Sequence, residues 1–410
     1  MKLLLVNADV LPGGDDWQAR RADILIDGVS IAAMAPKLAA PADAQVIDAS
    51  ALIVMPAFIN AHTHSPEMLG RALAPMAEQA EWLAVAYGDG RDALAGEDIA
   101  RAIRLCAADL VRGGAVGVTD HFRQVPMRAE AVHAAAQAWA ATGLDARIAL
   151  NLRDRVSAPS AGPAMSTEAV LALARDLMDA DLPVPVAPGA SAPQRASDRL
   201  LTGLFALSRE RASPLHMHLC ETAADAAACR ALYGVSAVAH LDRLGVLGPQ
   251  VELAHAVHVD AGDLDIIAAR GASIVHNPVA NLRLGSGVAP VARALRAGVN
   301  VRLGTDGAGS NDTQSMLEAA KFALLAPRAA MSRGEWPTPE QVLRMATAGA
   351  VLAPGQPANL LAFDAAASAF LGAESDPAPH IVLAAREADI VHVIGRGRFL
   401  MRNRRLEGVQ

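Results

Sequence analysis

The sequence has few cysteines and no long uncharged apolar run. Its three cysteines, Cys106, Cys220 and Cys229, form no C-x-x-C pair and would leave one thiol unpaired, which argues against a disulfide framework or a structural zinc site. No apolar run approaches the roughly 18 residues that a membrane span needs, and the N-terminal run turns polar too early for a signal peptide. We therefore expect a cytoplasmic protein without a membrane partner.

Charge of one sign is not concentrated along the chain. The formal net charge is −7, and the one basic cluster is the arginine-rich segment 395–406, which favours a solvated or salt-bridged strand face. Nucleic-acid binding needs clustered Lys and Arg side chains that neutralise phosphates. We therefore expect no nucleic-acid partner.

Apolar residues, in contrast, are abundant. They make up 52% of the chain, with a mean hydropathy of +0.25, and indicate a folded, enzyme-sized protein with a large core. Short β-rich runs separated by turn signals occupy both ends of the sequence. We expect residues 1–55 and 355–410 to pair into one small β-sandwich domain, and residues 56–354 to form a separate hydrolase domain.

Eight apolar runs of strand length recur in the middle of the chain, each followed by an alanine-rich stretch long enough for a crossover helix. They are residues 55–64, 115–122, 146–152, 184–191, 214–221, 251–259, 272–279 and 299–306. Continuous apolar strands that alternate with helices are typical of a parallel sheet buried on both faces. Eight such units predict an α/β fold, a closed (β/α)₈ TIM barrel.

Polar residues collect at the C-terminal ends of these runs, where the active site of such a barrel lies. They are His62, His64, His121, His218, Glu221, His255, His258, His276 and Asp306. Seven of the chain's twelve histidines are in this set, which chance does not readily explain. Within the first run, alternation places His62 and His64 on one face and Thr63 on the other, which is a chelating arrangement.

Neutral imidazoles with one carboxylate are a ligand set for Zn²⁺ or Fe²⁺, and a catalytic site keeps a further position for water. The predicted ligands are His62, His64, His218 and Asp306. A metal held by them would lower the pKa of water toward 7. Zinc is the favoured ion, and iron also fits.

Lysine is nearly absent, and this decides how many metal ions to expect. Lys2, Lys37 and Lys321 are the only lysines, and none lies on a predicted barrel strand. A carbamylated lysine that bridges two metals is therefore excluded. We expect one divalent metal.

Two further residues at the strand ends have candidate catalytic roles. Glu221 follows His218 by three residues and could carry protons to a substrate. His255 would lie beside the hydrolytic water and orient it, whereas His258 falls on the opposite face of that strand. The candidate substrate contacts are Trp82, His121, Arg153, Arg155 and His276.

Five motifs in order cover nearly the whole chain. They are "NAHTH" (60–64), "HLCET" (218–222), "LAHAVHVD" (253–260), "VHNPVANLRLGSGVAPV" (275–291) and "GTDGAGSND" (304–312). With them the sequence resembles the amidohydrolase superfamily, particularly its mononuclear cytosine deaminase-like and aminohydrolase branch. The members it resembles deaminate adenosine-type nucleosides, S-adenosylhomocysteine, guanine and pterins, or hydrolyse triazines.

The resemblance implies residue roles that agree with those read from the strand ends. It implies as metal ligands His62, His64, His218 and Asp306. It further implies that Glu221 is the proton shuttle, that His255 holds the hydrolytic water and that Asp306 takes the proton of this water. It also implies that the chain assembles into a homo-oligomer.

The predicted activity is metal-dependent hydrolytic deamination of a small nitrogen heterocycle, such as a purine, pterin or pyrimidine. One alternative is an s-triazine hydrolase that releases chloride or an alkylamine, and a second is a non-catalytic protein with the same fold. One departure bears on the substrate. In "QAEWL" (79–83), Ala80 stands where adenosine-type members carry an acidic residue that contacts ribose, which argues against a nucleoside.

Overall fold

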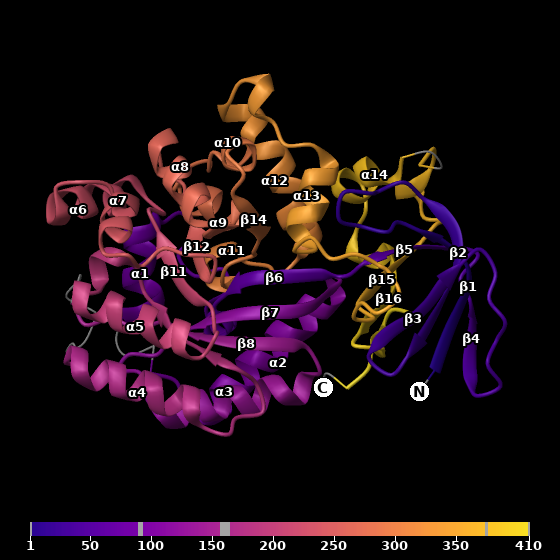
Figure 1. The fold of residues 1–410 in the computed structure, drawn as a ribbon, viewed down its shortest axis with the longest axis horizontal. Coiled ribbons are helices and arrows are strands. Elements are labelled where there is room, and N and C mark those ends of the chain that lie inside the picture. Colours follow the sequence, from indigo (N-terminus) through magenta and orange to yellow (C-terminus); the bar gives the residue numbers. More distant parts are fainter. Residues whose placement is uncertain (1, 89–92, 156–164, 374–375, 409–410) are drawn as a thin grey trace.

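The apolar runs in the middle of the chain form a ring of parallel strands, as the sequence predicts (Figure 1). The computed structural model, which describes residues 2–88, 93–155, 165–373 and 376–408, holds these strands in two hydrogen-bonded sheets. The first sheet contains β6 (Phe58–Thr63), β7 (Ala115–Phe122), β8 (Asp145–Leu150) and β9 (Val186–Ala187). The second contains β10 (Gly189–Ala190), β11 (Leu215–Leu219), β12 (Val251–His255), β13 (Ser273–His276) and β14 (Asn300–Leu303).

The two sheets meet at two seams that close the barrel. At the first seam the fourth predicted strand is split at Pro188, which has no N–H to donate, so β9 pairs with β8 while β10 pairs with β11. Gly189 permits this close approach, because a Cβ there would lie 2.4 Å from the carbonyl oxygen of Leu150. At the second seam the Asp306 N–H donates to the carbonyl oxygen of His62 at 2.9 Å. The predicted strands therefore close into a (β/α)₈ barrel.

Helices surround the strands, and α2 (Gly96–Arg112) illustrates how an apolar helix face is buried in the core. In α2, Ile99, Ile103, Cys106 and Leu110 recur at the helical period, and all four side chains are buried in the core. Among the described residues, none of the helices combines the length and apolarity required to cross a membrane. The helices are α1 (Gln79–Tyr87), α2 (Gly96–Arg112), α3 (Ala129–Thr142), α4 (Thr167–Asp179), α5 (Asp198–Glu210), α6 (Ala223–Tyr233), α7 (Ala237–Arg243), α8 (Ala261–Arg270), α9 (Pro278–Arg283), α10 (Val291–Arg296), α11 (Ala308–Asn311), α12 (Met316–Ala330), α13 (Pro339–Ala346) and α14 (Pro377–Leu383).

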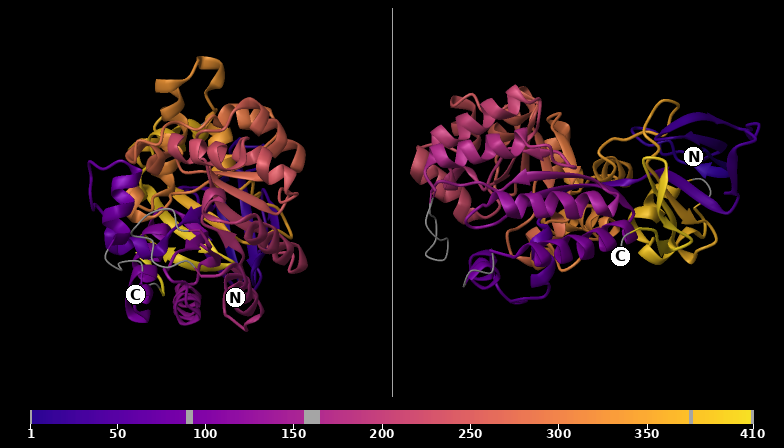
Figure 2. Two further views of the ribbon diagram at one scale, coloured as in Figure 1. Left: turned by 90° about the vertical axis from the view of Figure 1, so that its left-hand side faces the viewer. Right: turned by 90° about the horizontal axis from the view of Figure 1, so that it is seen from below.

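Strands from both ends of the chain form a separate sheet beside the barrel, as predicted (Figures 1 and 2). Its nine strands are β1 (Lys2–Val10), β2 (Arg20–Asp27), β3 (Ser30–Ala35), β4 (Ala44–Asp48), β5 (Leu52–Pro56), β15 (Leu360–Asp364), β16 (Ile390–Gly395), β17 (Arg398–Arg402) and β18 (Arg405–Leu406). Antiparallel pairing of β5 with β15 joins the two ends. Ile31 of β3 and Phe399 of β17 are far apart in the strand order but share one apolar core. The two layers of the predicted β-sandwich are therefore two parts of one sheet that curls over this core.

The connection from the last barrel helix to this sheet is short but anchored. After α13 ends at Ala346, the chain reaches β15 through residues that bond to the N-terminal segment. Leu352 N–H donates to the carbonyl oxygen of Pro12 at 2.7 Å, and Gly14 N–H donates to that of Ala350 at 3.1 Å. These contacts hold the connection against the start of the chain.

Candidate metal centre and active site

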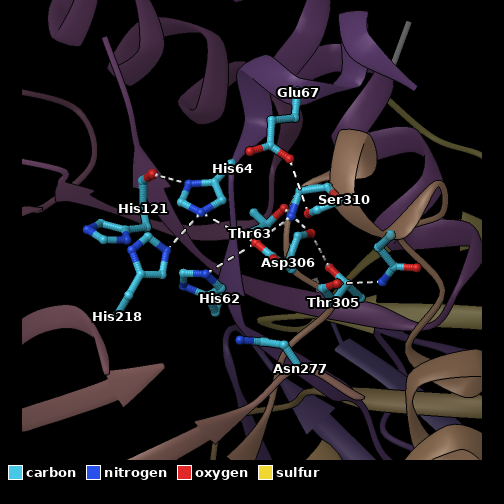
Figure 3. Close-up of polar contacts among 12 residues, drawn as sticks. His62, Thr63, His64, Glu67, His121, His218, Asn277, Thr305, Asp306 and Ser310 are labelled. Atoms are coloured by element: carbon cyan, nitrogen blue, oxygen red, sulfur yellow. Dashed lines mark hydrogen bonds and ion pairs between the residues drawn. The ribbon is translucent and has the colours of Figure 1, made fainter. Parts of the chain in front are cut away.

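Histidines and a carboxylate from three separate parts of the barrel converge at one mouth (Figure 3). The Nε2 atoms of His64 and His218 lie 3.1 Å apart. Asp306 Oδ1 lies 3.3 Å from His62 Nε2 and 3.4 Å from His64 Nε2. The structure thus brings together the four predicted ligands. Their potential ligand atoms belong to two overlapping groups, each within 4.8 Å, which are His62, His64, His121 and His218, and His62, His255 and Asp306.

The protonation pattern of these rings fits a metal cation. Nδ1 of His64 donates to the carbonyl oxygen of His121, and Nδ1 of His218 donates to that of Ser191, each at 2.6 Å. A carbonyl oxygen can only accept, so the proton of each neutral ring is on Nδ1 and the two Nε2 lone pairs face each other. Buried His62 Nε2 also has no hydrogen-bond partner among the described residues. A divalent cation between these atoms would satisfy all three lone pairs.

The electrostatics favour the same arrangement. Burial holds the pKa of the His62 and His218 imidazoles well below the ordinary value, so both are neutral, which is the form that binds metal. The site therefore presents neutral nitrogens beside the Asp306 carboxyl.

Side chains that face away from the cluster fix the position of Asp306. Thr63, on the opposite face of β6 from the two histidines, places its hydroxyl 3.0 Å from the Asp306 carbonyl oxygen and 2.8 Å from the Gln314 side-chain oxygen. Asn60 donates to the Thr305 hydroxyl at 2.7 Å and accepts from the Thr305 N–H at 3.0 Å. The first strand and the loop after β14 are thus tied together, and Asp306 is held at φ +67°, a left-handed conformation that costs a non-glycine residue energy.

Glu221 and His255 lie together beside the predicted ligands. Glu221 Oε2 is 3.9 Å from His255 Nε2 and accepts a hydrogen bond from the Gln79 side chain. Nδ1 of His255 donates to Asn281 Oδ1 at 2.8 Å, so Nε2 is directed toward Glu221. Burial alone would lower the pKa of this imidazole, but the Glu221 and Asp306 carboxylates raise it above its ordinary value. Burial raises the pKa of the Glu221 carboxyl, which favours the protonated form that a general acid needs.

A pocket opens over the cluster, and a second cavity adjoins it. The first is lined by His64, Glu67, Gln79, Trp82, Leu83, Tyr87, Arg123, Asn151, Arg195, His218, Glu221, His255, Leu284, Asp306 and Ser310. The second, of about 260 Å³, is mostly apolar and shares with the first Glu67, Trp82, Tyr87 and Arg123. These four side chains are therefore common to the walls of both spaces.

The structure separates the predicted substrate contacts. Trp82 lines both cavities, and its buried Nε1–H has no partner among the described residues, so it is free to donate to a ligand. His121 and His276 are buried and do not line either cavity. Arg153 lines a different cavity, and Arg155 lies 3.4 Å from the Tyr233 hydroxyl. His258, which the alternation turned away, donates from Nε2 to the Ser286 carbonyl oxygen at 2.7 Å.

The inference drawn from Ala80 is wrong, because the residue does not face the pocket. Helix α1 turns Gln79, Trp82, Leu83 and Tyr87 toward the pocket at helical spacing, whereas Ala80 is exposed. An acidic side chain at this position would start from the exposed face of α1 and not from the pocket wall. Its absence therefore does not argue against a nucleoside.

Several pocket residues were not found from the sequence, and Glu67 is the most informative. It is buried, it accepts hydrogen bonds from Tyr87 and Ser310, and burial raises its pKa to about 7. A Cβ at Gly307 would lie 1.9 Å from its carboxylate, so the glycine makes room for it. Its place three residues after His64 was the available signal. Asn151 stands at the end of the predicted strand 146–152 and carried the same strand-end signal, whereas Arg195 lies outside the predicted strands and carried none.

His276 provides a pH-dependent contribution to stability. Burial lowers the pKa of its imidazole to about 3, below the ordinary 6.5, so as the pH falls the unfolded chain takes up the proton first. The contribution of His276 to stability is therefore complete above about pH 6.5 and declines toward pH 3. From this pKa difference the loss is about 2 kcal/mol at pH 5. We expect His276→Leu to show a smaller drop in melting temperature than the wild type between pH 7.5 and pH 5, measured by differential scanning calorimetry; equal drops would contradict this.

Comparison with known proteins identifies relatives over the full length of the chain. The family model described as "Amidohydrolase family" matches residues 53–400. A 5-methylthioadenosine/S-adenosylhomocysteine deaminase from Syntrophobacter fumaroxidans is 33% identical over 424 residues, covering 98% of this chain and 94% of the relative.

Solved structures share the same architecture. An adenosine deaminase from Xanthomonas campestris with bound zinc is 26% identical, with a TM-score of 0.87 over 99% of this chain and 94% of its own. An atrazine chlorohydrolase from Arthrobacter aurescens complexed with zinc is 25% identical, with a TM-score of 0.90 over 98% of this chain and 96% of its own.

Proposed function

The chain belongs to the amidohydrolase family, and on this basis we propose that it is a zinc-dependent hydrolytic deaminase that releases ammonia from an adenosine derivative or a related nitrogen heterocycle. The observation that carries the proposal is the convergence of His64 Nε2 and His218 Nε2, 3.1 Å apart, beside the Asp306 carboxylate, while Nδ1 of each ring donates to a main-chain carbonyl oxygen. The names of the deaminase relatives support the choice of an amine as leaving group.

The residues divide the chemistry between them. His62, His64, His218 and Asp306 would hold the metal, which when bound makes water a nucleophile near neutral pH. His255, with Nε2 directed into the pocket, orients the attacking water, and Asp306 accepts its proton. Glu221, whose carboxyl pKa is raised by burial, donates a proton to the ring nitrogen next to the carbon under attack.

The reaction replaces one bond by another at a ring carbon. A C–O bond forms as the ring nitrogen is protonated, and the C–N bond to the exocyclic amine then breaks. The amine takes up the proton that Asp306 accepted from the water and leaves as ammonia, while the new hydroxyl group returns a proton to Glu221 and becomes a carbonyl. Trp82 lines the pocket where the ring would lie, and its Nε1–H, which has no partner in the described part of the chain, can bond to an acceptor of the substrate.

A substrate panel tests the proposal. Zinc-loaded protein is mixed with adenosine, 5-methylthioadenosine, S-adenosylhomocysteine, guanine, cytosine, a pterin and a chloro-s-triazine, and released ammonia and chloride are measured. We expect ammonia from at least one adenosine derivative, with the ultraviolet change of adenine to hypoxanthine. We propose that a substituent beyond the ring lies in the adjoining apolar cavity, and we therefore expect these substrates to react faster than the pyrimidine.

The same panel separates the other candidates. Chloride release without ammonia would show a triazine hydrolase and contradict the deaminase proposal. Protein that elemental analysis finds free of metal, and that binds no added zinc, would instead support a non-catalytic role.

A further inference from the structure

Beneath the predicted metal ligands, a layer of polar and charged side chains fills the interior of the barrel. His216 on β11 and Glu252 on β12 are paired neighbours in the sheet, and they are 0% and 3% exposed. Arg147 on β8 and Arg302 on β14 reach the same carboxylate. Barrel interiors are usually packed with branched apolar side chains, and buried charges are costly even when paired. This layer therefore requires an explanation other than stability.

The layer forms one continuous chain of hydrogen bonds that ends at a metal ligand. Arg147 and Arg302 donate to the two oxygens of Glu252 at 2.5 and 2.8 Å. Glu252 Oε2 lies 3.0 Å from His216 Nδ1, and His216 Nε2 lies 2.8 Å from His62 Nδ1. The planes of the two imidazoles differ by 15° and their centroids lie 5.0 Å apart, a separation that places the two rings edge to edge across the 2.8 Å nitrogen contact.

The chemistry of the chain fixes where its protons are. Burial alone would raise the pKa of the Glu252 carboxyl, but Arg147 and His216 hold it well below its ordinary value, so Glu252 is ionised and can only accept. His216 Nδ1 must then carry a proton, and Nε2 of the neutral ring is an acceptor. His62 Nδ1–H therefore donates to it, which leaves the lone pair of His62 on Nε2, toward Asp306.

His62 differs in this respect from the other two predicted imidazole ligands. His64 and His218 donate from Nδ1 to main-chain carbonyl oxygens, which no substitution can remove. The proton position of His62 depends on two side chains. It is thus the one histidine of the three whose tautomer mutation can alter without touching a ligand.

We infer that His216 and Glu252 are positioning residues that hold the His62 ring in its metal-binding tautomer and increase its affinity for the cation. The inference rests on the proposed metal-dependent function. Groups that bond to the far nitrogen of a metal-binding histidine orient the ring and increase its basicity, and their loss costs about 10- to 100-fold in metal affinity.

Zinc release from the folded protein tests the inference. Glu252→Gln keeps the shape of the side chain, but its amide can donate to His216 Nδ1 and so reverse the direction of the chain. We expect zinc to transfer to a chromogenic chelator about 10- to 100-fold faster from Glu252→Gln and from His216→Phe than from the wild type. Asp263→Asn is the matched control. Asp263 on α8 is a buried carboxylate that bonds to Ser236 and contacts none of Arg147, Arg302, Glu252, His216 and His62. This variant should release zinc at the wild-type rate.

The outcomes distinguish this inference from the proposed function. If the wild type binds no divalent metal, both are overturned. If the wild type binds zinc and Glu252→Gln releases it within twofold of the wild-type rate, the inference alone is overturned.

A measurement on the metal-free wild type does not depend on any variant. Histidine-selective ¹⁵N NMR identifies the protonated nitrogen of each ring, with His62→Asn used to assign the signal of His62. We expect His62 to carry its proton on Nδ1. A His62 ring protonated on Nε2 in the metal-free protein would overturn the inference.

Discussion

Glu221→Gln is expected to lower kcat about 10³-fold while the protein keeps its zinc. The substitution preserves the size of the side chain and removes its titrating proton, and general acid catalysis by one positioned group contributes about 10²- to 10⁴-fold. Glu221 is not among the donors that converge at 3.1 to 3.4 Å, so the metal content should not change. Steady-state ammonia release and elemental analysis of the same preparation measure both quantities.

A neighbouring carboxylate is the control for this prediction. Asp225 follows on the same segment, where it caps α6 by bonding to Thr222, and it does not line the pocket. Asp225→Asn should keep kcat within a few-fold of the wild type. Turnover of Glu221→Gln at the wild-type rate would remove Glu221 from the mechanism, whereas loss of zinc would move it into the ligand set.

Asp306→Asn is expected to abolish both zinc binding and turnover. The change removes the only anionic member of the four predicted ligands and the group proposed to accept the proton of the water. We expect zinc affinity to fall by more than about 100-fold, the upper end of the cost of losing a group that merely supports a ligand. Because both roles are lost, kcat should fall by at least about 10³-fold. Isothermal titration of metal-free protein with zinc measures the first effect.

Asp312 offers a matched comparison in the same loop. Its carboxylate accepts from Arg283 Nε at 3.0 Å and from Ala72 N–H at 2.8 Å, and it does not line the pocket. Asp312→Asn should therefore bind zinc as the wild type does. Wild-type zinc affinity in Asp306→Asn would contradict the ligand assignment.

The convergence of the predicted ligand side chains could be predicted because the apolar runs of the sequence show where the barrel strands end. The runs that end in His62, His218 and Asp306 have the length and apolarity of buried parallel strands, and a closed barrel brings all such ends to one mouth. The division of His62 and His64 from Thr63 follows from the twofold period of a strand and appears in the structure.

The residues that surround the predicted ligands depend on how helices and strands pack together, and the hydrophobic periodicity of the sequence does not give this packing. The sequence indicated that Trp82 is near the site, but not that Ala80 is on the exposed face of α1, because the register of that helix against the barrel is set by packing. Likewise, His216 reads as a residue of an apolar strand. Its link to Glu252 appears only when β11 and β12 lie side by side.

The seam between the first and last barrel strands has a consequence for how the protein acquires its metal. His62 and Asp306 stand 244 positions apart and meet where the Asp306 N–H donates to the His62 carbonyl oxygen. Bringing such distant segments together carries a loop-closure entropy that must be met before the donors share one point. An unfolded or partly folded chain consequently has no preformed site. A metal ion would therefore bind only after the barrel has closed, and its binding would stabilise the closed barrel against opening at this seam.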